Sequence, residues 1–470
     1  MTEEPQTTHG GLSGNRVATL LVVPGIALLV LYRIGVRAEG VRDIVWFLKV
    51  VGVQSVIYFG AVWLSLRVRE SRSVLIVALV FAGLLRLSIL FSPPYLSDDI
   101  HRYVWDGRVQ AAGINPYRYI PADQALIGLR DEKIYPKINR REFAHTIYPP
   151  VAEAIFLLTT RVSESVTWMK ATMLAFEALA IWAIIQLLAS FGLPRQRIMI
   201  YAWHPLVVWE FAGSGHLDAI AIAFIAVALL AYRKNKEVKS GFALACAAMV
   251  KFFPLVLSPA IYKSWTWKTP LVFTITILVA YVPYLSVGPR AVFGYLPGYA
   301  KEEGLLTGSQ FYVLSLARKL IGANVPTASF IIFAVVLIGA IAAWALFREQ
   351  KRDSDLINAA LLATSVTVIF APHFSWYFAW LVPFLCFRPH LSLFYLTAAS
   401  FILYGTWLED TPDQMFKLNS FLYLPFGLLL LTQLLVGRRR NTVIAIAACN
   451  TTTGSNSREL TREKKDNLGR

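Results

Sequence analysis

Two adjacent carboxylates stand out as candidates for chemistry in this sequence. Asp98 and Asp99 directly follow an apolar run and open a polar stretch at residues 93–167. A hydroxyl group is a weak nucleophile and needs a base within hydrogen-bond reach. Two neighbouring carboxylates at a membrane boundary can have their pKa values pushed apart, so that one stays ionised as the base while the other orients a substrate or a cation. The pair therefore indicates general-base chemistry on a substrate carried by lipid.

A short helix is expected to position this pair. Ser97 is a suitable N-cap, the two acids would occupy the first turn, and Gly113 would end the helix. Acids in a first turn also complement the helix dipole, so a purely structural role is the alternative. Arg102 could pair with one of the acids along the helix or bind phosphate. Together with Tyr103, it gives the acids the polar neighbours that a substrate site needs.

The rest of the chain has the composition of a membrane protein. Hydrophobic residues make up 56% and charged residues 16% of it, and the mean hydropathy is +0.54. Successive apolar runs predict an all-α polytopic membrane protein with about 12–14 membrane segments. The net charge of +16 lies largely in short loops and the C-terminal tail, which is typical of topology signals and not of nucleic-acid binding. The three cysteines form neither a disulfide framework nor a zinc site.

The basic loops also predict the orientation of the chain, because such loops favour the cytoplasmic side. All the polar clusters of chemical interest then face the extracytoplasmic side. The predicted regions are a cytoplasmic N-terminus at 1–16, three membrane helices at 17–92, an extracytoplasmic catalytic loop with juxtamembrane helices at 93–167, the remaining bundle at 168–436 with an extracytoplasmic loop at 288–325, and a basic, disordered cytoplasmic tail at 437–470.

Two segments do not fit a simple series of spans. Segment 240–261 has basic loops at both ends, so we predict a re-entrant hairpin that breaks near Lys251. Segment 148–162 is too short to cross a bilayer and is expected to be half-inserted. Irregular backbone at membrane depth is tolerated only against protein or a cavity. Both segments therefore indicate an internal cavity.

Four polar residues in apolar surroundings are further candidates for substrate binding. His216 and Asp218 lie two residues apart at a turn, where a sugar or phosphate contact and a structural hydrogen bond are equally supported. Lys251 lies within an apolar segment, so it either faces a cavity and binds phosphate or extends its ammonium to the surface. His373 lies at a predicted membrane edge and is a candidate of the same kind.

The order of these motifs resembles the GT-C superfamily of membrane glycosyltransferases. The similarity is greatest to the polyprenol-phosphate-mannose-dependent mannosyltransferases, which include bacterial enzymes and the enzyme that adds the first mannose to the GPI anchor. It spans roughly residues 70–435. After Asp98 and Asp99, the matching pieces are Ala112–Tyr117, Tyr148–Pro150, His204–Pro205, Gly215–Asp218, Lys251–Pro254 and Pro372–Tyr377.

The resemblance implies a GT-C type helical bundle that takes a hexose, with mannose favoured, from a polyprenyl phosphate to a lipid or glycan acceptor. It implies direct displacement with inversion, and an acidic residue of the first loop as the base. By position, Asp98 and Asp99 match the family's acidic pair, and Asp98 is slightly favoured as the base. The chain departs from the family in carrying two extra spans before the acidic loop and in having its acids adjacent.

Other interpretations remain open at this stage. The donor sugar could be glucose or a pentose. Lys251 and broken helices would also suit a transporter or a flippase, although no internal repeat supports it. A non-catalytic membrane subunit is a further alternative. No cofactor is implied with certainty, and a divalent cation could bind between the carboxylates. The compact form favours a multi-pass protein of a bacterial inner membrane, with the active site outside and membrane lipids as partners.

Overall fold

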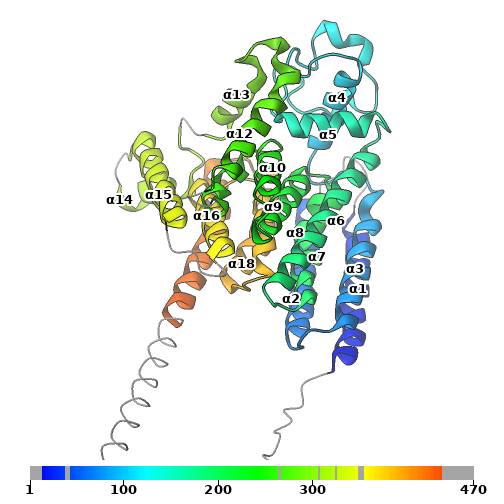
Figure 1. Cartoon of the computed structure of the whole chain (residues 1–470), viewed down its shortest axis with the longest axis vertical. Coiled ribbons are helices and arrows are strands. Elements are labelled where there is room, and N and C mark those ends of the chain that lie inside the picture. The colour runs from blue at the N-terminus through cyan, green and yellow to red at the C-terminus, as the bar shows by residue number, and fades with distance from the viewer. Residues whose placement is uncertain are drawn as a thin grey trace, which may run out of the picture.

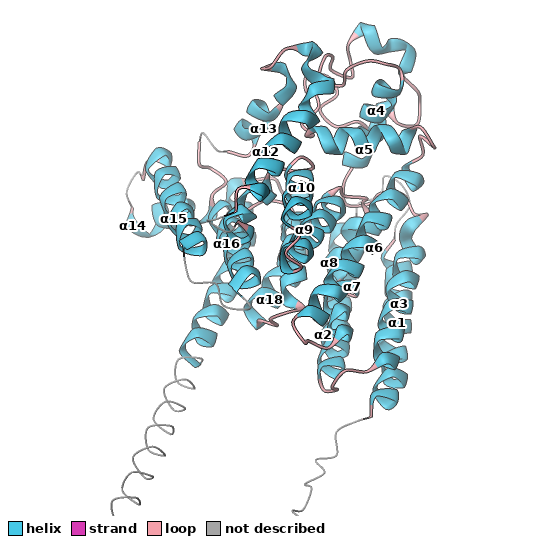
Figure 2. Ribbon diagram, viewed as in Figure 1, coloured by secondary structure: helices cyan, strands magenta, loops and turns pink. Residues whose placement is uncertain are grey.

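The computed structural model describes residues 13–36, 43–262, 266–304, 307–322, 325–347 and 354–436. Helices provide the regular structure of this part of the chain, and no strand occurs in it (Figures 1 and 2). Seven of the described helices are long and apolar enough to cross a membrane. This confirms the all-α polytopic class. They are α1 (Gly14–Gly35), α2 (Ile44–Leu66), α3 (Arg72–Leu90), α6 (Val166–Ser190), Lys268–Val287, which includes α12 (Lys268–Tyr281), α15 (Thr327–Phe347), and Pro412–Val436.

The remaining apolar runs form shorter or interrupted helices, which is why fewer long spans are seen than the number of runs predicted. The run at 198–212 divides into α7 (Met199–Ala202) and α8 (Pro205–Val208). Pro205 cannot continue the preceding helix, and the ring of His204 accepts a hydrogen bond from the Leu206 amide to start the next one. Other short elements are α9 (Asp218–Arg233), α10 (Glu237–Ala248), α16 (Ser354–Phe370), α17 (Val382–Leu385) and α18 (Leu391–Ala399).

The membrane-type helices carry apolar side chains on their outer faces as well as inside. Val23 of α1 and Val56 of α2 are 70% and 72% exposed. Exposed apolar surface on this scale is unusual on a water-facing protein and is expected of a lipid-facing helix. The inner faces form one continuous core that includes residues from α1, α3, α6 and α9.

A buried ion pair fastens the interrupted segment to this core. Arg86 of α3 and Glu177 of α6 are 6% and 1% exposed, and Arg86 Nε donates to Glu177 Oε2 over 2.9 Å. Arg86 Nη1 also donates to the carbonyl oxygen of Ala202 over 2.6 Å, where α7 ends. A carbonyl left free by a helix break needs a donor at this depth, and Arg86 supplies it.

Segment 240–261 breaks where the sequence predicted. Helix α10 ends at Ala248, an irregular turn carries Lys251, and a 3₁₀ turn follows at Phe253–Leu257. The hydroxyl of Thr269 lies 3.5 Å from the carbonyl oxygen of Glu237, so the chain returns beside the start of α10. This return supports the hairpin that the basic residues at both ends of the segment required.

One end of the bundle carries a cap built from two loops (Figure 1). The first is residues 93–167, which form α4 (Asp99–Ala111), two 3₁₀ turns at Gln124–Leu129 and Tyr135–Lys137, and α5 (Pro150–Thr160). Helix α5 lies across the end of the bundle and, with 11 residues, would extend only about 16 Å. The second loop contributes α13 (Leu296–Glu302).

Helix α4 ends before Gly113 as predicted, but its N-cap is Asp98 and not Ser97, so only Asp99 lies in the first turn. The Ser97 hydroxyl accepts a hydrogen bond from the amide of Asp99 over 3.2 Å, and Asp98 occupies the N-cap position. The helix ends at Ala111, and Gly113 adopts a φ of 78° that a residue with a side chain rarely takes. The predicted disordered tail at 437–470 lies outside the described residues.

Candidate active site

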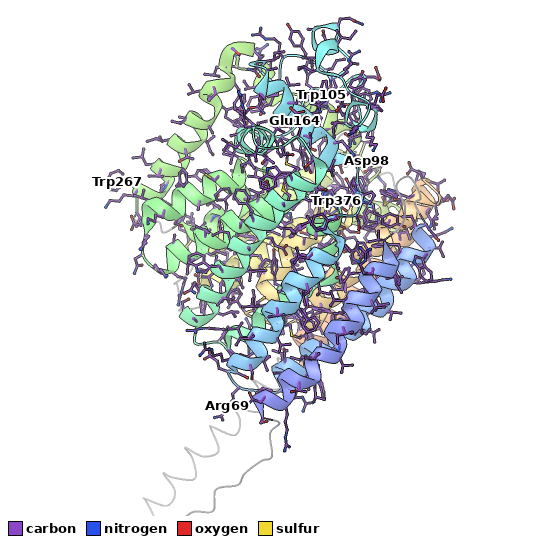
Figure 3. All side chains as sticks on the ribbon, turned by 90° about the vertical axis from the view of Figure 1, so that its right-hand side faces the viewer. Arg69, Asp98, Trp105, Glu164, Trp267 and Trp376 are labelled. Carbon is purple, nitrogen blue, oxygen red and sulfur yellow. The ribbon has the colours of Figure 1, made fainter. Side chains whose placement is uncertain are left out.

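A cavity of about 240 Å³ lies at the start of α4, beneath the cap. Five of the predicted site residues line it: Asp98, Asp99, Arg102, Tyr103 and Lys251. Asp98 and Trp376, which share its wall, lie between Trp105 toward one end of the molecule and Arg69 near the other (Figure 3). The structure therefore brings the carboxylate pair, two of the candidate cations and an aromatic wall into one space.

Asp99 is oriented in the cavity by a neighbouring amide. Its Oδ1 accepts a hydrogen bond from Asn139 Nδ2 over 2.6 Å, and its side chain is half-buried. Removal from water raises the pKa of Asp99, while the Asn139 hydrogen bond and the charges of Lys251 and Arg140 oppose that rise. A carboxylate with a raised pKa is a stronger base once it is ionised.

Arg102 is held by Asp106, one turn further along α4. Its Nε lies 2.8 and 2.9 Å from the two Asp106 oxygens, and its Nη1 donates to the carbonyl oxygen of Ala144 over 3.1 Å. From the sequence, Arg102 was expected either to pair with Asp98 or Asp99 or to bind phosphate. The structure shows Asp106 instead. Asp98 also lies four residues from Arg102, but it is half-buried at the N-cap, whereas Asp106 is buried beside Arg102.

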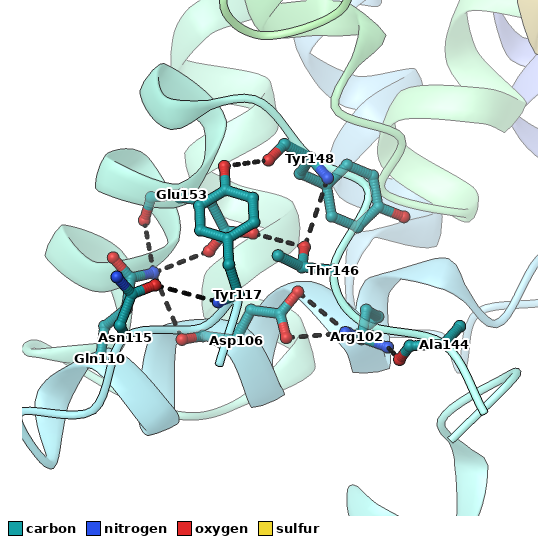
Figure 4. A network of polar contacts seen from close by, with 9 residues as sticks. All are labelled: Arg102, Asp106, Gln110, Asn115, Tyr117, Ala144, Thr146, Tyr148 and Glu153. Carbon is teal, nitrogen blue, oxygen red and sulfur yellow. Dashed lines mark hydrogen bonds and ion pairs between the residues drawn. The ribbon is translucent and has the colours of Figure 1, made fainter. Parts of the chain in front are cut away.

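The Arg102–Asp106 pair belongs to a polar network that holds the first loop together (Figure 4). Thr146 Oγ1 donates to Glu153 Oε1 over 2.6 Å, and Gln110 Nε2 donates to Glu153 Oε2 over 2.8 Å. Burial and the neighbouring Asp106 raise the pKa of Glu153 well above its usual range. The network joins α4 to α5 and to the loop segment around Thr146, which forms one wall of the cavity.

Lys251 is oriented by a carboxylate behind it. Its Nζ lies 2.8 and 2.7 Å from the two oxygens of Asp218, which is fully buried and also accepts from Trp380 Nε1 over 2.6 Å. The ammonium lies 4.7 Å from the centre of the Tyr377 ring. Lys251 therefore faces the cavity, whereas Asp218 stands one layer behind it.

His216 also lies behind the cavity wall. Its ring stacks on Trp376 with centroids 4.1 Å apart, and Trp376 stacks on Phe374 at 4.3 Å. Phe374 and Trp376 line the cavity, and His216 supports them from below. The backbone amide of His216 bonds the carbonyl oxygen of Glu210, which lies in a π-helical turn at Trp209–Gly213. Such turns are frequent at functional sites.

Helix α13 covers the cavity from the second loop. The Tyr299 and Tyr377 hydroxyls lie 2.6 Å apart, and Tyr299 lines the cavity. His373 Nδ1 lies 3.1 Å from Glu303 Oε2 at the end of the same helix. His373 therefore contacts the cover of the cavity, and its neighbour Phe374 forms part of the wall.

Asn139 and Arg140 are among the lining residues that were not predicted from the sequence. Arg140 lines the cavity, bonds Glu302 through Nε at 2.7 Å, and has a φ of 54°. A non-glycine residue in this conformation is uncommon and often marks a functional site. Their loop position gave no pattern from which to predict this.

The side chains described do not include any group of three or more His, Cys, Asp or Glu residues that could hold a metal ion. The two acids of the cavity stand instead among the cations Arg102, Arg140 and Lys251. This lining suits a ligand with an anionic part and a hydroxyl-bearing part, because the cations can bind the first and a carboxylate can accept a proton from the second.

Residues 13–268 match the family described as alpha-(1→6)-mannopyranosyltransferase, N-terminal domain. The match covers more than half of the 470-residue chain. The chain belongs to this mannosyltransferase family. Its activity is therefore mannosyl transfer, which confirms the glycosyltransferase class and the sugar that the resemblance favoured. No curated protein and no solved structure matches the chain.

The matched region of this mannosyltransferase contains most of the predicted site. Asp98, Asp99, Lys251 and their buried supports lie within residues 13–268. His373 and the aromatic wall at 374–377 lie beyond it. The cavity is thus assembled from the matched domain and from the second half of the chain.

Proposed function

We propose that the chain transfers mannose from a polyprenyl-phosphate donor to a hydroxyl of a lipid or glycan acceptor, with inversion at the anomeric carbon. The observation that carries this proposal is that Asp99, Lys251 and Arg140 line one cavity. A base and a phosphate-binding pair are the two groups that such a displacement requires.

In the proposed reaction Asp99, and not Asp98 as the resemblance slightly favoured, accepts the proton of the acceptor hydroxyl, because Asn139 orients Asp99 and the charges of Lys251 and Arg140 act on it. The hydroxyl oxygen bonds to the anomeric carbon while the bond from that carbon to the phosphate oxygen breaks. The electron pair of the broken bond leaves with the phosphate, whose growing charge Lys251 and Arg140 stabilise. Because attack and departure occur on opposite faces of the sugar, a single displacement inverts the configuration. Arg102, held by Asp106, adds positive charge to the same wall.

The membrane setting supports a lipid-borne donor used on the outer side. The cavity lies at the end of the bundle opposite Arg69, whose loop also carries Arg67 and Arg72. Basic short loops favour the cytoplasm, so the cavity would open on the extracytoplasmic side. A donor anchored by a polyprenyl chain could place its phosphate at this level while its hydrocarbon stays among the apolar outer faces of the helices.

The test is mannosyl transfer by the purified protein in detergent. We would compare a polyprenyl-phosphate-mannose donor with a nucleotide-linked mannose, using a short alkyl α-mannoside as acceptor. The lipid donor should be used and the nucleotide donor should not, and NMR of the product should show inversion. Asp99→Asn should reduce kcat by about 10²–10⁴-fold, and Asp98→Asn by less. Equal use of both donors, or a fully active Asp99→Asn protein, would contradict the proposal.

A further inference from the structure

One tyrosine of the cavity wall has no role in the proposed reaction. Tyr148 lies two residues before the start of α5, and it lines the same cavity as Asp99 and Arg102. The residue is buried on most sides, with 7% of its surface exposed. Its backbone faces the polar network around Glu153, whereas its hydroxyl points away from that network (Figure 4). The hydroxyl therefore lies on the side of the residue that the loop network does not use.

The backbone of Tyr148 is held on both sides. Its amide donates to Thr146 Oγ1 over 3.3 Å, and its carbonyl oxygen accepts from the Tyr117 hydroxyl over 2.6 Å. Pro149 and Pro150 follow at once, and a residue before proline has fewer backbone conformations open to it. The position of the Tyr148 backbone is therefore set by the loop before any substrate binds.

The ring of Tyr148 is held by two other aromatic rings. It meets Tyr103 edge to face, with centroids 5.0 Å apart and planes at 87°, and it meets Phe156 in the same way at 5.5 Å and 86°. Tyr103 and Phe156 stack on each other at 4.7 Å. Packing against this stacked pair restricts the rotation of the ring. The hydroxyl therefore keeps its direction, and little conformational entropy is lost when it binds a ligand.

The surroundings of the hydroxyl keep it a hydrogen-bond donor. Burial raises the pKa of Tyr148 well above its usual range, and the charge of Asp99 raises it further, while the charge of Arg102 opposes the rise. The phenol is therefore neutral and protonated at any pH at which the protein would work. A neutral donor suits an uncharged hydroxyl group, whereas Arg102, Arg140 and Lys251 supply the charge that a phosphate needs.

The proposed displacement determines which part of the substrate can reach Tyr148. Asp99 acts at one face of the anomeric carbon, and the cations hold the phosphate at the opposite face. The mannosyl group lies between them, and charges of both kinds act on the Tyr148 hydroxyl. We propose that Tyr148 donates a hydrogen bond to a hydroxyl of the mannosyl group and so helps to select the sugar that is transferred. This rests on the proposed function and adds a specificity-determining residue to it.

The test removes the hydroxyl from the protein and from the sugar in turn. Tyr148→Phe keeps the ring contacts and the backbone hydrogen bonds, so its unfolding midpoint should equal that of the wild type. Tyr135→Phe is the matched control, because Tyr135 lies in the same loop and does not line the cavity. The donors would be the mannosyl donor and four analogues, each lacking the hydroxyl at C2, C3, C4 or C6.

We expect Tyr148→Phe to lower kcat/KM for the mannosyl donor about 10–100-fold and Tyr135→Phe to leave it unchanged. One analogue lacks the hydroxyl that Tyr148 binds. Tyr148→Phe should use this analogue at least as well as the wild type does, because the bond is already lost and no buried hydroxyl is left without a partner. The other three analogues should show the full loss.

Three results of this comparison would overturn the proposal. An equal loss with all five donors would assign Tyr148 a structural role. No loss with any donor would remove its hydroxyl from the site. A loss that disappears with a deoxygenated acceptor, and not with a deoxygenated donor, would place the contact on the acceptor.

Binding without transfer separates this proposal from the proposed function. β-Mannose 1-phosphate and inorganic phosphate would be titrated into the Asp99→Asn protein by calorimetry, since neither carries a lipid or needs an acceptor. Adding Tyr148→Phe should weaken binding of the sugar phosphate about tenfold and leave binding of phosphate unchanged. This pattern would support the sugar contact even if transfer failed with the polyprenyl donor. Equal weakening of both ligands, weakening of neither, or failure of the Asp99→Asn protein to bind the sugar phosphate would refute it.

Discussion

The ammonium group of Lys251 is paired through both oxygens of Asp218, a residue that does not itself line the cavity. Asp218 is fully buried, while the Lys251 side chain is 18% exposed. The carboxylate therefore holds the cation at the wall, with one side of the ammonium left toward the substrate space. This division of roles can be measured.

Asp218→Asn keeps the shape of the side chain and its acceptor for Trp380 but removes the charge that holds Lys251. We expect kcat/KM for mannosyl transfer to fall about 10–100-fold, equivalent to about 1.4–2.8 kcal/mol. Lys251→Met should cost more, because it removes the cation itself. The double variant should be no worse than Lys251→Met if Asp218 acts through Lys251. Additive losses in this cycle would show that Asp218 contacts the substrate independently.

Asn139 should set the pH range over which Asp99 acts as a base. Its hydrogen bond lowers the pKa of Asp99, so Asn139→Ala should raise that pKa further. Since the base must be ionised, activity is lost as pH falls through this pKa. The acidic limb of the kcat/KM profile should therefore move to higher pH. Rates well above this limb serve as the control and should stay near wild type. An unshifted limb would remove Asn139 from the mechanism.

Gly107 permits the close contact between α4 and α5. A Cβ atom at this position would lie 2.5 Å from the carbonyl oxygen of Phe156, which is backbone and cannot rotate away. Gly107→Ala should lower stability by about 1–3 kcal/mol through overpacking. The matched control is Gly128→Ala in the same loop, where a Cβ would meet nothing within 4 Å. Thermal unfolding in detergent would compare the two, and equal midpoints would contradict the assigned contact.

The buried pair of Arg86 and Glu177 should follow the behaviour of ion pairs in low-dielectric surroundings. Arg86→Met alone leaves a buried carboxylate without its partner and should cost about 3–5 kcal/mol. The double change Arg86→Met with Glu177→Met should recover much of that loss. Recovery will be incomplete, because the Ala202 carbonyl also loses its donor. Chemical unfolding would report both values, and a double variant less stable than the single one would refute this account.

Local patterns were sufficient to predict the helical class, the position of α4 and the carboxylate pair. Apolar runs and a terminating glycine such as Gly113 act over a few residues, so the sequence alone predicts them, whereas the N-cap proved to be Asp98 and not Ser97. The break near Lys251 followed from the basic residues at both ends of its segment. These predictions needed no knowledge of which segments meet in space.

The remaining features of the site depend on contacts between residues far apart in the sequence, which local patterns do not predict. Asn139 and Arg140 reach the cavity because the loop around them is held by α13, a segment more than 150 residues away. Arg102 pairs with Asp106 because both side chains are buried on one face of α4. Helix spacing alone does not favour this pair over a pair with Asp98 or Asp99. His216 and His373 occupy supporting positions, since stacking on Trp376 and pairing with Glu303 place them behind lining residues.

The cavity wall supplied by the second half of the chain, including α13, limits which fragments of this enzyme would keep a closed active site. Tyr299, Phe374, Trp376 and Tyr377 all line the cavity, and all lie beyond residue 268, where the family match ends. A fragment restricted to the matched domain would keep the base and its cations but would leave them open to water on one side. Chimaeras that take the second half of the chain from a relative should therefore change the shape of the cavity wall, while the proton-accepting carboxylate stays the same.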